Sequence, residues 1–162
     1  MIALMSELHL YSPTVYLLHP PLNGAPMSTT NKTIVQRFNQ EVIAQCRREA
    51  FEALVDEDFV NHSAPSGQPQ GREGLWNTFK NVLHAGLTDL QVEVLDQVAE
   101  GDKVTTRKRI TGQHTGELVG IAATGRQVVI EVMDIVRLRD GQYIEHWGIN
   151  SLGSALAALR SA

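Results

Sequence analysis

The chain has 162 residues, of which 43% are apolar and 20% charged, and its formal net charge is −4. This length and composition suit one domain with a core of its own. The negative charge argues against a nucleic-acid-binding protein, which usually carries a basic patch. No apolar run reaches the roughly 18 residues of a membrane helix. The single cysteine, Cys46, allows no intrachain disulfide, so a reducing cytoplasm is the expected location.

Residues 1–27 read differently from the rest of the chain. They contain four prolines and no lysine or arginine, and Glu7 interrupts the apolar start, which argues against a secretory signal. We interpret 1–27 as an irregular arm or as sequence upstream of the true start, because Met27 could itself be the initiator. The alternative is a segment that covers a neighbouring subunit or the opening of a pocket. Residues 28–162 are predicted to form a single domain.

Helical spacing of apolar residues dominates the first half of this domain. It predicts helices over about 31–45, 48–55 and 72–85, the last one capped by Gly86. A loop rich in proline and glycine over 63–71 precedes the last of these helices.

From Asp89 the apolar period changes to two, which is typical of strands. Strands are expected on both sides of a turn at 100–102, then over 128–138 and 142–150, and a short helix over 154–160. The Gly-rich segment 112–125 is predicted to be a long irregular connection. Helices followed by long antiparallel strands predict an α+β domain, with helices packed on one face of a curved sheet. The concavity of such a sheet commonly binds a small molecule.

The last two strands carry the strongest candidate site. Asp140-Gly141 between two alternating runs is a strong hairpin signal. Because side chains two apart share a face of a strand, Asp134 should point inward with Val136 and Leu138. His146 should point inward from the second strand, together with Ile144, Gly148 and Asn150. A carboxylate and an imidazole on neighbouring strands can carry out proton transfer.

Other residues could join these two, and for each a simpler role exists. Lys108 should point inward with Val104, Thr106 and Ile110, and either it neutralises Asp134 as a structural ion pair or it stabilises a negative charge on a ligand. His62 is expected at the pocket rim, or as a loop histidine that caps nearby backbone. Asn150 and Trp76 are candidate ligand contacts, although packing is the simpler role for Trp76. No metal, nucleotide-binding or nucleophile-elbow motif is present, so no metal or cofactor is expected.

Several short segments together resemble one family over about 31–159. They are Phe59-Val-Asn-His62, Gly71-Arg-Glu-Gly74, Thr88-Asp-Leu-Gln-Val92, Gly112-Gln-His-Thr-Gly116, Gly120-Ile-Ala-Ala-Thr-Gly125, Asp134-Ile-Val-Arg137 and Asp140-Gly-Gln-Tyr-Ile-Glu-His-Trp147. In this order and spacing they are similar to SnoaL-like proteins of the nuclear transport factor 2-like superfamily.

The resemblance implies a cone-shaped α+β barrel with N-terminal helices on the concave side of a curved, mostly antiparallel sheet. It also implies an internal pocket and a homodimer through the outer sheet face, where Arg107 and Arg109 would lie. Characterised members include cyclases of aromatic polyketide biosynthesis, which close a ring by an intramolecular aldol step without cofactor or metal.

Three positions of this chain depart from those cyclases. Gly148 stands where the family's catalytic aspartate is expected, and Asp134 stands where a second functional histidine is expected. Lys108 replaces a large apolar residue that relatives often carry, which would favour an acidic or carbonyl ligand group. The known catalytic set is therefore not reproduced.

Three hypotheses remain open at the level of sequence. The first is a cofactor-independent acid–base enzyme of the cyclase, isomerase or lyase type, acting on a hydrophobic carbonyl compound, with Asp134 as base, His146 as proton partner and Lys108 as enolate stabiliser. The second is a binding module for a small hydrophobic or aromatic ligand. The third is an interaction domain that uses its outer sheet face.

Overall fold

Residues 27–161 are described by the computed structural model, and a curled sheet is its central feature. The sheet has the order β1-β5-β4-β3-β2 and does not close into a full barrel. β1 pairs with β5 in parallel, and every other neighbouring pair is antiparallel. The strands are β1 Val55–Asn61, β2 Leu87–Glu100, β3 Lys103–His114, β4 Gln127–Arg139 and β5 Gln142–Asn150.

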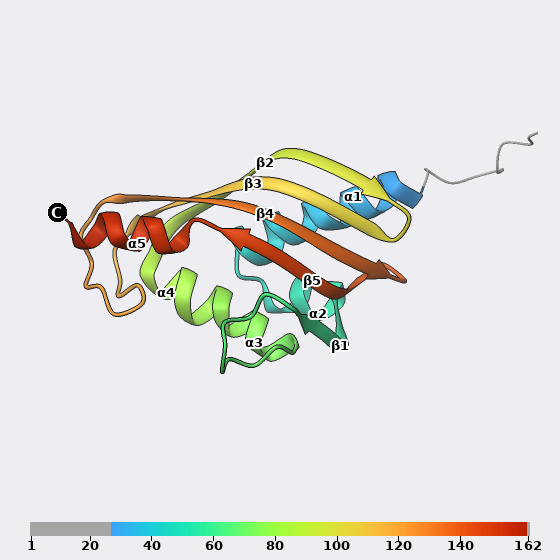
Figure 1. Cartoon of the computed structure of the whole chain (residues 1–162), viewed down its shortest axis with the longest axis horizontal. Coiled ribbons are helices and arrows are strands. Elements are labelled where there is room, and N and C mark those ends of the chain that lie inside the picture. The colour runs from blue at the N-terminus through green and yellow to red at the C-terminus, as the bar shows by residue number, and fades with distance from the viewer. Residues whose placement is uncertain (1–26, 162) are drawn as a thin grey trace, which may run out of the picture.

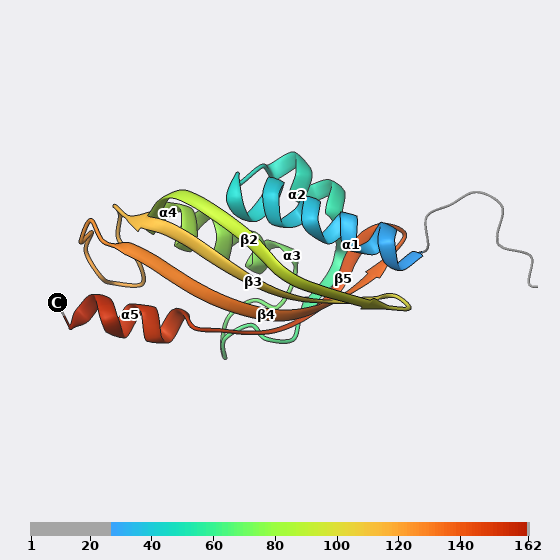
Figure 2. The ribbon, with the colours of Figure 1, turned by 90° about the horizontal axis from the view of Figure 1, so that it is seen from above.

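Helices cover the concave side of this sheet and both of its long edges (Figures 1 and 2). α1 and α2 lie along one side of the strands, α3 and α4 lie beneath them, and α5 runs along the opposite side. The helical segments are α1 Met27–Phe38, η1 Asn39–Ala44, α2 Arg48–Leu54, α3 Arg72–Asn77, η2 Thr78–Leu83, α4 His84–Gly86 and α5 Leu152–Arg160. The predicted α+β cone is confirmed. Within the described residues, no helix is both long enough and apolar enough to cross a membrane.

Alternating burial along the strands is what separates core from surface. On β3 the even-numbered residues from Val104 to His114 are buried, and the odd-numbered residues face outward. β4 follows the same rule, with Val128, Ile130, Asp134, Val136 and Leu138 buried. The core therefore fills the space between the concave face and the helices.

Several predicted boundaries differ from the structure. The first helix begins at Met27 rather than Asn31, and Asn31 is a buried residue whose side-chain amide donates to the Gly101 carbonyl at 3.3 Å. Asn31 therefore lies inside the helix and connects α1 to the β2–β3 turn. The predicted helices over 31–45 and 72–85 each contain a π-helical segment, η1 in the first and η2 in the second. The spacing of apolar residues does not predict these segments. The predicted arm over 1–27 lies outside the described residues, except for Met27.

The β4–β5 hairpin contains a bulge that changes which residues face inward. Its turn has positive φ at Asp140 and Gly141, as the predicted turn requires. Arg137 pairs with Glu145, but Leu138 pairs with Tyr143, so Ile144 is the extra residue. Ile144 was predicted to point inward, but it is only half-buried and is not part of the core, whereas its neighbour Tyr143 is fully buried. His146 and Gly148 keep the predicted face.

Candidate functional site

Lys108, Asp134 and His146 meet on the concave face of the sheet. Lys108 Nζ donates to Asp134 Oδ2 at 2.7 Å, and both side chains are almost fully buried, with 5% and 6% exposed. His146 Nε2 lies 3.7 Å from the same Oδ2 atom. β3, β4 and β5 are adjacent in the sheet, so three residues from separate strands converge here. The three predicted inward-facing residues are therefore brought together.

Electrostatics keep Asp134 ionised in this buried position. Burial alone would raise the pKa of its carboxyl, but the Lys108 charge and hydrogen bonds outweigh that effect and hold the pKa below its ordinary value. Within residues 27–161, Oδ1 of the same carboxylate is buried and has no hydrogen-bond partner. A buried carboxylate oxygen without a partner is costly, so Oδ1 has unused capacity to accept a hydrogen bond.

Asn61 joins Lys108, Asp134 and His146, and these four residues form the polar set of the site. The role of Asn61 was not predicted. It ends β1, where it pairs with His146 on β5 in parallel register. Its Oδ1 lies 2.8 Å from His146 Nδ1 and also accepts from the Ser63 backbone N–H at 3.0 Å. The imidazole is therefore held from one side by Asn61, while its other nitrogen faces Asp134.

Gly148 makes room for the His146 ring. A Cβ atom added at this position would lie 3.0 Å from both Cε1 and Nε2 of His146, and 3.2 Å from the Asp134 Cβ. Any side chain here would compete with the imidazole for space. In the cyclases that this chain resembles, a catalytic aspartate is expected at the position of Gly148. In this chain the ring of His146, two residues earlier on β5, occupies the space beside that position.

We expect Gly148→Ala to displace the His146 ring and to destabilise the protein by about 1–3 kcal/mol, which is typical of overpacking. Chemical denaturation would measure the loss of stability. Gly153→Ala in α5 is the matched control, because an added Cβ there meets nothing within 4 Å. A loss at Gly148 no larger than at Gly153 would contradict the steric argument.

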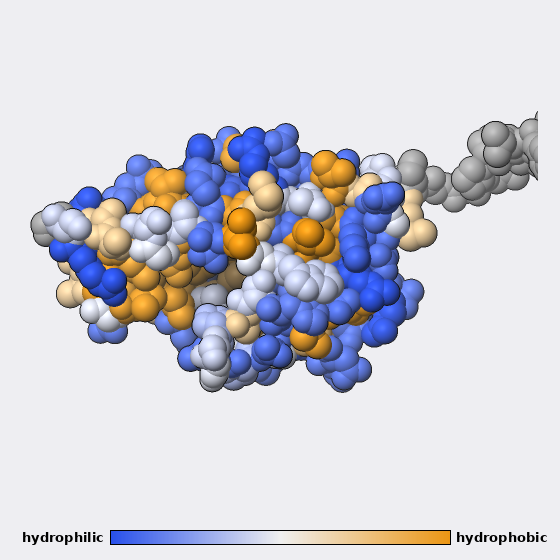
Figure 3. Space-filling model, in the orientation of Figure 1, coloured by the Kyte–Doolittle hydropathy of each residue, from blue (hydrophilic) through white to orange (hydrophobic). Residues whose placement is uncertain are grey.

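An aromatic row forms an apolar wall near the polar set. Phe79 of η2 packs edge-on against Phe38 of α1, with ring centroids 5.8 Å apart, and Phe38 stacks on Tyr143 of β5 at 4.4 Å. Burial and the Asp134 charge raise the pKa of Tyr143 well above its ordinary value, so its phenol stays protonated. Figure 3 shows a hollow in this face of the protein, between the end of β5 and the α3–α4 helical segment of Figure 1.

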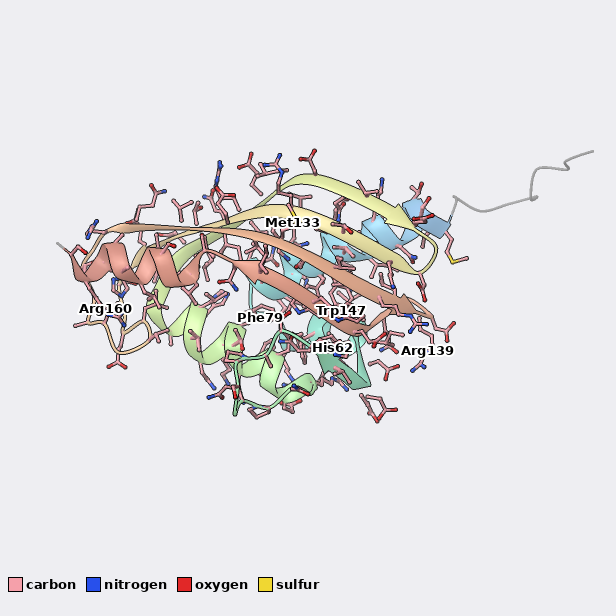
Figure 4. All side chains as sticks on the ribbon, in the orientation of Figure 1. His62, Phe79, Met133, Arg139, Trp147 and Arg160 are labelled. Atoms are coloured by element: carbon pink, nitrogen blue, oxygen red, sulfur yellow. The ribbon has the colours of Figure 1, made fainter. Side chains whose placement is uncertain are left out.

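His62 lies apart from Asp134, on the other side of β5. Its ring stacks on Trp147 with centroids 4.6 Å apart, and its Nε2 lies 3.0 Å from Glu145 Oε1. Figure 4 shows His62 and Trp147 next to each other. Glu145 and Trp147 alternate with His146 along the strand and so point away from it. The structure does not bring His62 into the cluster around Asp134.

The remaining two predicted ligand contacts also lie apart from the cluster. Asn150 pairs with Val132 at the exposed end of β5, and its side-chain oxygen accepts from the Leu152 backbone N–H at the start of α5. Trp76 is buried against Phe51, with ring centroids 5.1 Å apart. The contacts of Asn150 and Trp76 are therefore those of structural residues.

A second, charged cleft of about 660 Å³ lies beside α2, β1 and the β4–β5 turn. Arg48 contacts Glu52 and Glu73, and Arg139 contacts Asp56, so these arginines are already neutralised. Over residues 27–161, no group of three or more His, Cys, Asp or Glu side chains could hold one metal ion.

Comparison with known proteins agrees with the fold described above. A model of the SnoaL-like polyketide cyclase family matches residues 33–159, and the chain therefore belongs to that family. No functionally curated protein matches the chain at a significant level.

Solved structures with the same fold extend the comparison. IdmH, a candidate polyketide cyclase from Streptomyces antibioticus, is 29% identical, with 80% of this chain and 98% of IdmH covered and a TM-score of 0.70. A candidate SnoaL-like polyketide cyclase from Jannaschia sp. CCS1 is 26% identical, with 87% and 99% covered and a TM-score of 0.72. AclR, a candidate hydroxylase from Streptomyces galilaeus, shares the fold at 24% identity, with 83% and 98% covered and a TM-score of 0.72.

Proposed function

We propose that this protein is a cofactor-independent acid–base enzyme, of the cyclase, isomerase or lyase type, for a hydrophobic carbonyl compound. Asp134 takes an acidic C–H proton from the ligand, and the released electron pair moves to the carbonyl oxygen as an enolate. His146 Nε2, 3.7 Å from the carboxylate, receives that proton and returns it to the product. Lys108 supplies the positive charge that stabilises the enolate.

The observation that carries this proposal is the buried Oδ1 of Asp134, which has no partner among the described residues. Lys108 occupies the other carboxylate oxygen and keeps the group ionised. An ionised carboxylate oxygen next to an imidazole and an aromatic wall is suited to proton abstraction from an apolar ligand.

The second candidate function is a binding module that holds a hydrophobic ligand without converting it. The 2.7 Å contact between Lys108 and Asp134 favours it, because each charge is sufficiently explained as the counterion of the other. Gly148 also favours it, since glycine cannot transfer a proton at the position where the cyclases of this family carry their catalytic aspartate.

A ligand screen distinguishes these two candidates. The purified protein is screened by thermal shift against polyaromatic, terpenoid and β-keto-ester compounds, and every hit is incubated and followed by mass spectrometry. An enzyme gives a product of changed mass or retention time at a rate above the protein-free control. A binding module raises the melting temperature and returns the compound unchanged.

We also propose that the protein forms a homodimer in the cytoplasm, through the outer face of its sheet. Met133, Ile135 and Ile149 are exposed on this face, with 47%, 39% and 73% of their surface accessible. Ion pairs of both signs flank them, Arg109 with Glu131 on one side and Arg137 with Asp102 on the other. An apolar strip between mixed charges suits a two-fold contact with a second copy.

We expect Met133→Lys to convert this dimer to a monomer, because it places a charge in the apolar strip without disturbing the core. Light scattering after gel filtration would measure the mass. Val119→Lys is the matched control, since Val119 is 50% exposed but lies in the loop between β3 and β4. If the unmodified chain is monomeric at high micromolar concentration, the dimer proposal is wrong.

A further inference from the structure

The atoms around Asn61 determine which nitrogen of His146 carries a proton. The Ser63 backbone N–H lies 3.0 Å from the side-chain atom of Asn61 that faces it, and a backbone N–H can only donate. That atom must therefore be the amide oxygen, Oδ1, and the amide orientation is fixed.

The same oxygen lies 2.8 Å from His146 Nδ1. An amide oxygen carries no hydrogen, so Nδ1 must be the donor in this contact. A neutral imidazole has one N–H, and in this arrangement its lone pair is therefore on Nε2. The contact with Asn61 selects the tautomer in which Nδ1 is protonated.

The lone pair on Nε2 faces the acidic side of the site. Nε2 lies 3.7 Å from Asp134 Oδ2. Neither a neutral Nε2 nor a carboxylate oxygen can donate to the other. A proton placed between these two atoms would satisfy both acceptors. It can still belong to the ligand, or it can be the proton removed from the ligand.

We propose that Asn61 is a positioning residue, which holds His146 with Nδ1 protonated and so confines proton exchange to Nε2, on the Asp134 side. This inference rests on the proposed function, in which a C–H proton reaches Nε2 by way of Asp134. It also restricts the ligand, whose acidic group must lie on the Asp134 side of the imidazole. Asn61 itself touches no reacting atom in this scheme.

The first test reads the tautomer directly and needs no ligand. The ¹⁵N chemical shifts of the six histidines are recorded in the full-length labelled chain above their titration range, and His146 is assigned with His146→Gln. We expect an N–H signature at Nδ1 and a lone-pair signature at Nε2. A protonated Nε2 in the unmodified protein would overturn the inference.

Two substitutions at Asn61 then separate positioning from general stability. Asn61→Leu removes the acceptor, and we expect His146 to lose its preference for the Nδ1-protonated form. Asn61→Asp keeps an acceptor oxygen at the same place, so the tautomer should persist. Ser63→Ala is the control, because it removes the contact from the Gly148 N–H to Ser63 Oγ and leaves the Asn61 amide in place.

Turnover provides the last test once the screen has identified a substrate. We expect Asn61→Leu to lower kcat at least tenfold with little change in KM, and Asn61→Asp to retain activity. Full activity in Asn61→Leu would overturn the positioning role. Because the tautomer is measured without substrate, an error in the proposed reaction and an error in this inference give different results.

Discussion

Asp134→Asn is expected to lower turnover of an identified substrate by about 10²–10⁴-fold, the range that a positioned general base contributes. The amide keeps the shape of the carboxylate but cannot accept the proton. In the structure Asp134 is desolvated beside His146, and its pKa is held below the ordinary value of a carboxyl group. Initial rates with the hit from the ligand screen would measure the change.

The control for this variant is the same chemical change elsewhere on the sheet. Asp96→Asn breaks only a surface pair with Arg107, and its activity should match that of the unmodified protein. Because Asp134→Asn leaves Lys108 buried without its partner, His146→Gln is tested beside it, since that variant keeps the ion pair. Turnover within twofold of normal in both folded variants would rule out the proposed base and proton partner.

Lys108→Met is expected to destabilise the protein by about 3–5 kcal/mol, because it leaves the Asp134 charge buried without its partner. Only 5% of the Lys108 side chain and 6% of the Asp134 side chain are exposed, so solvent cannot compensate for the lost ion pair. Urea denaturation at neutral pH would give the difference in unfolding free energy. A loss below 1 kcal/mol would show that the pair is solvated in solution.

The double variant Lys108→Met/Asp134→Leu tests whether the loss comes from the remaining charge. It should be more stable than Lys108→Met, because an apolar pair leaves no buried ion. In the unmodified protein the Asp134 pKa lies below its unfolded value, so its contribution is present above about pH 4 and is lost as the pH falls through the folded pKa.

The pH dependence of Lys108→Met should have the opposite sign. Without the Lys108 charge, burial raises the Asp134 pKa above its unfolded value, and the folded state then binds the proton more tightly. The deficit relative to the unmodified protein should therefore be largest near pH 7 and smaller near pH 4. Unfolding curves at these two pH values would show it, and an equal deficit at both would contradict the explanation.

The sequence alone determined the class of fold and the inner face of the sheet. Periods of 3.6 and of two are local properties, and they predicted the helices, the four antiparallel strands and the Asp140-Gly141 turn. Alternation along a strand then placed Lys108, Asp134 and His146 on the concave side, where the structure has them. The ordered motifs predicted the family, which the match over 33–159 confirms.

Only the tertiary structure decided the partners within the site. Asn61 and His146 are 85 residues apart, and their contact depends on the parallel pairing of β1 with β5, which no local pattern encodes. The bulge at Ile144, which turns Tyr143 inward, likewise arises from the register of two strands. His62 follows Asn61 directly, beyond the end of β1, and it contacts Glu145 and Trp147, which alternate with His146 along β5. Local periodicity thus gives each strand its two faces, and the pairing of strands far apart in sequence decides which side chains meet.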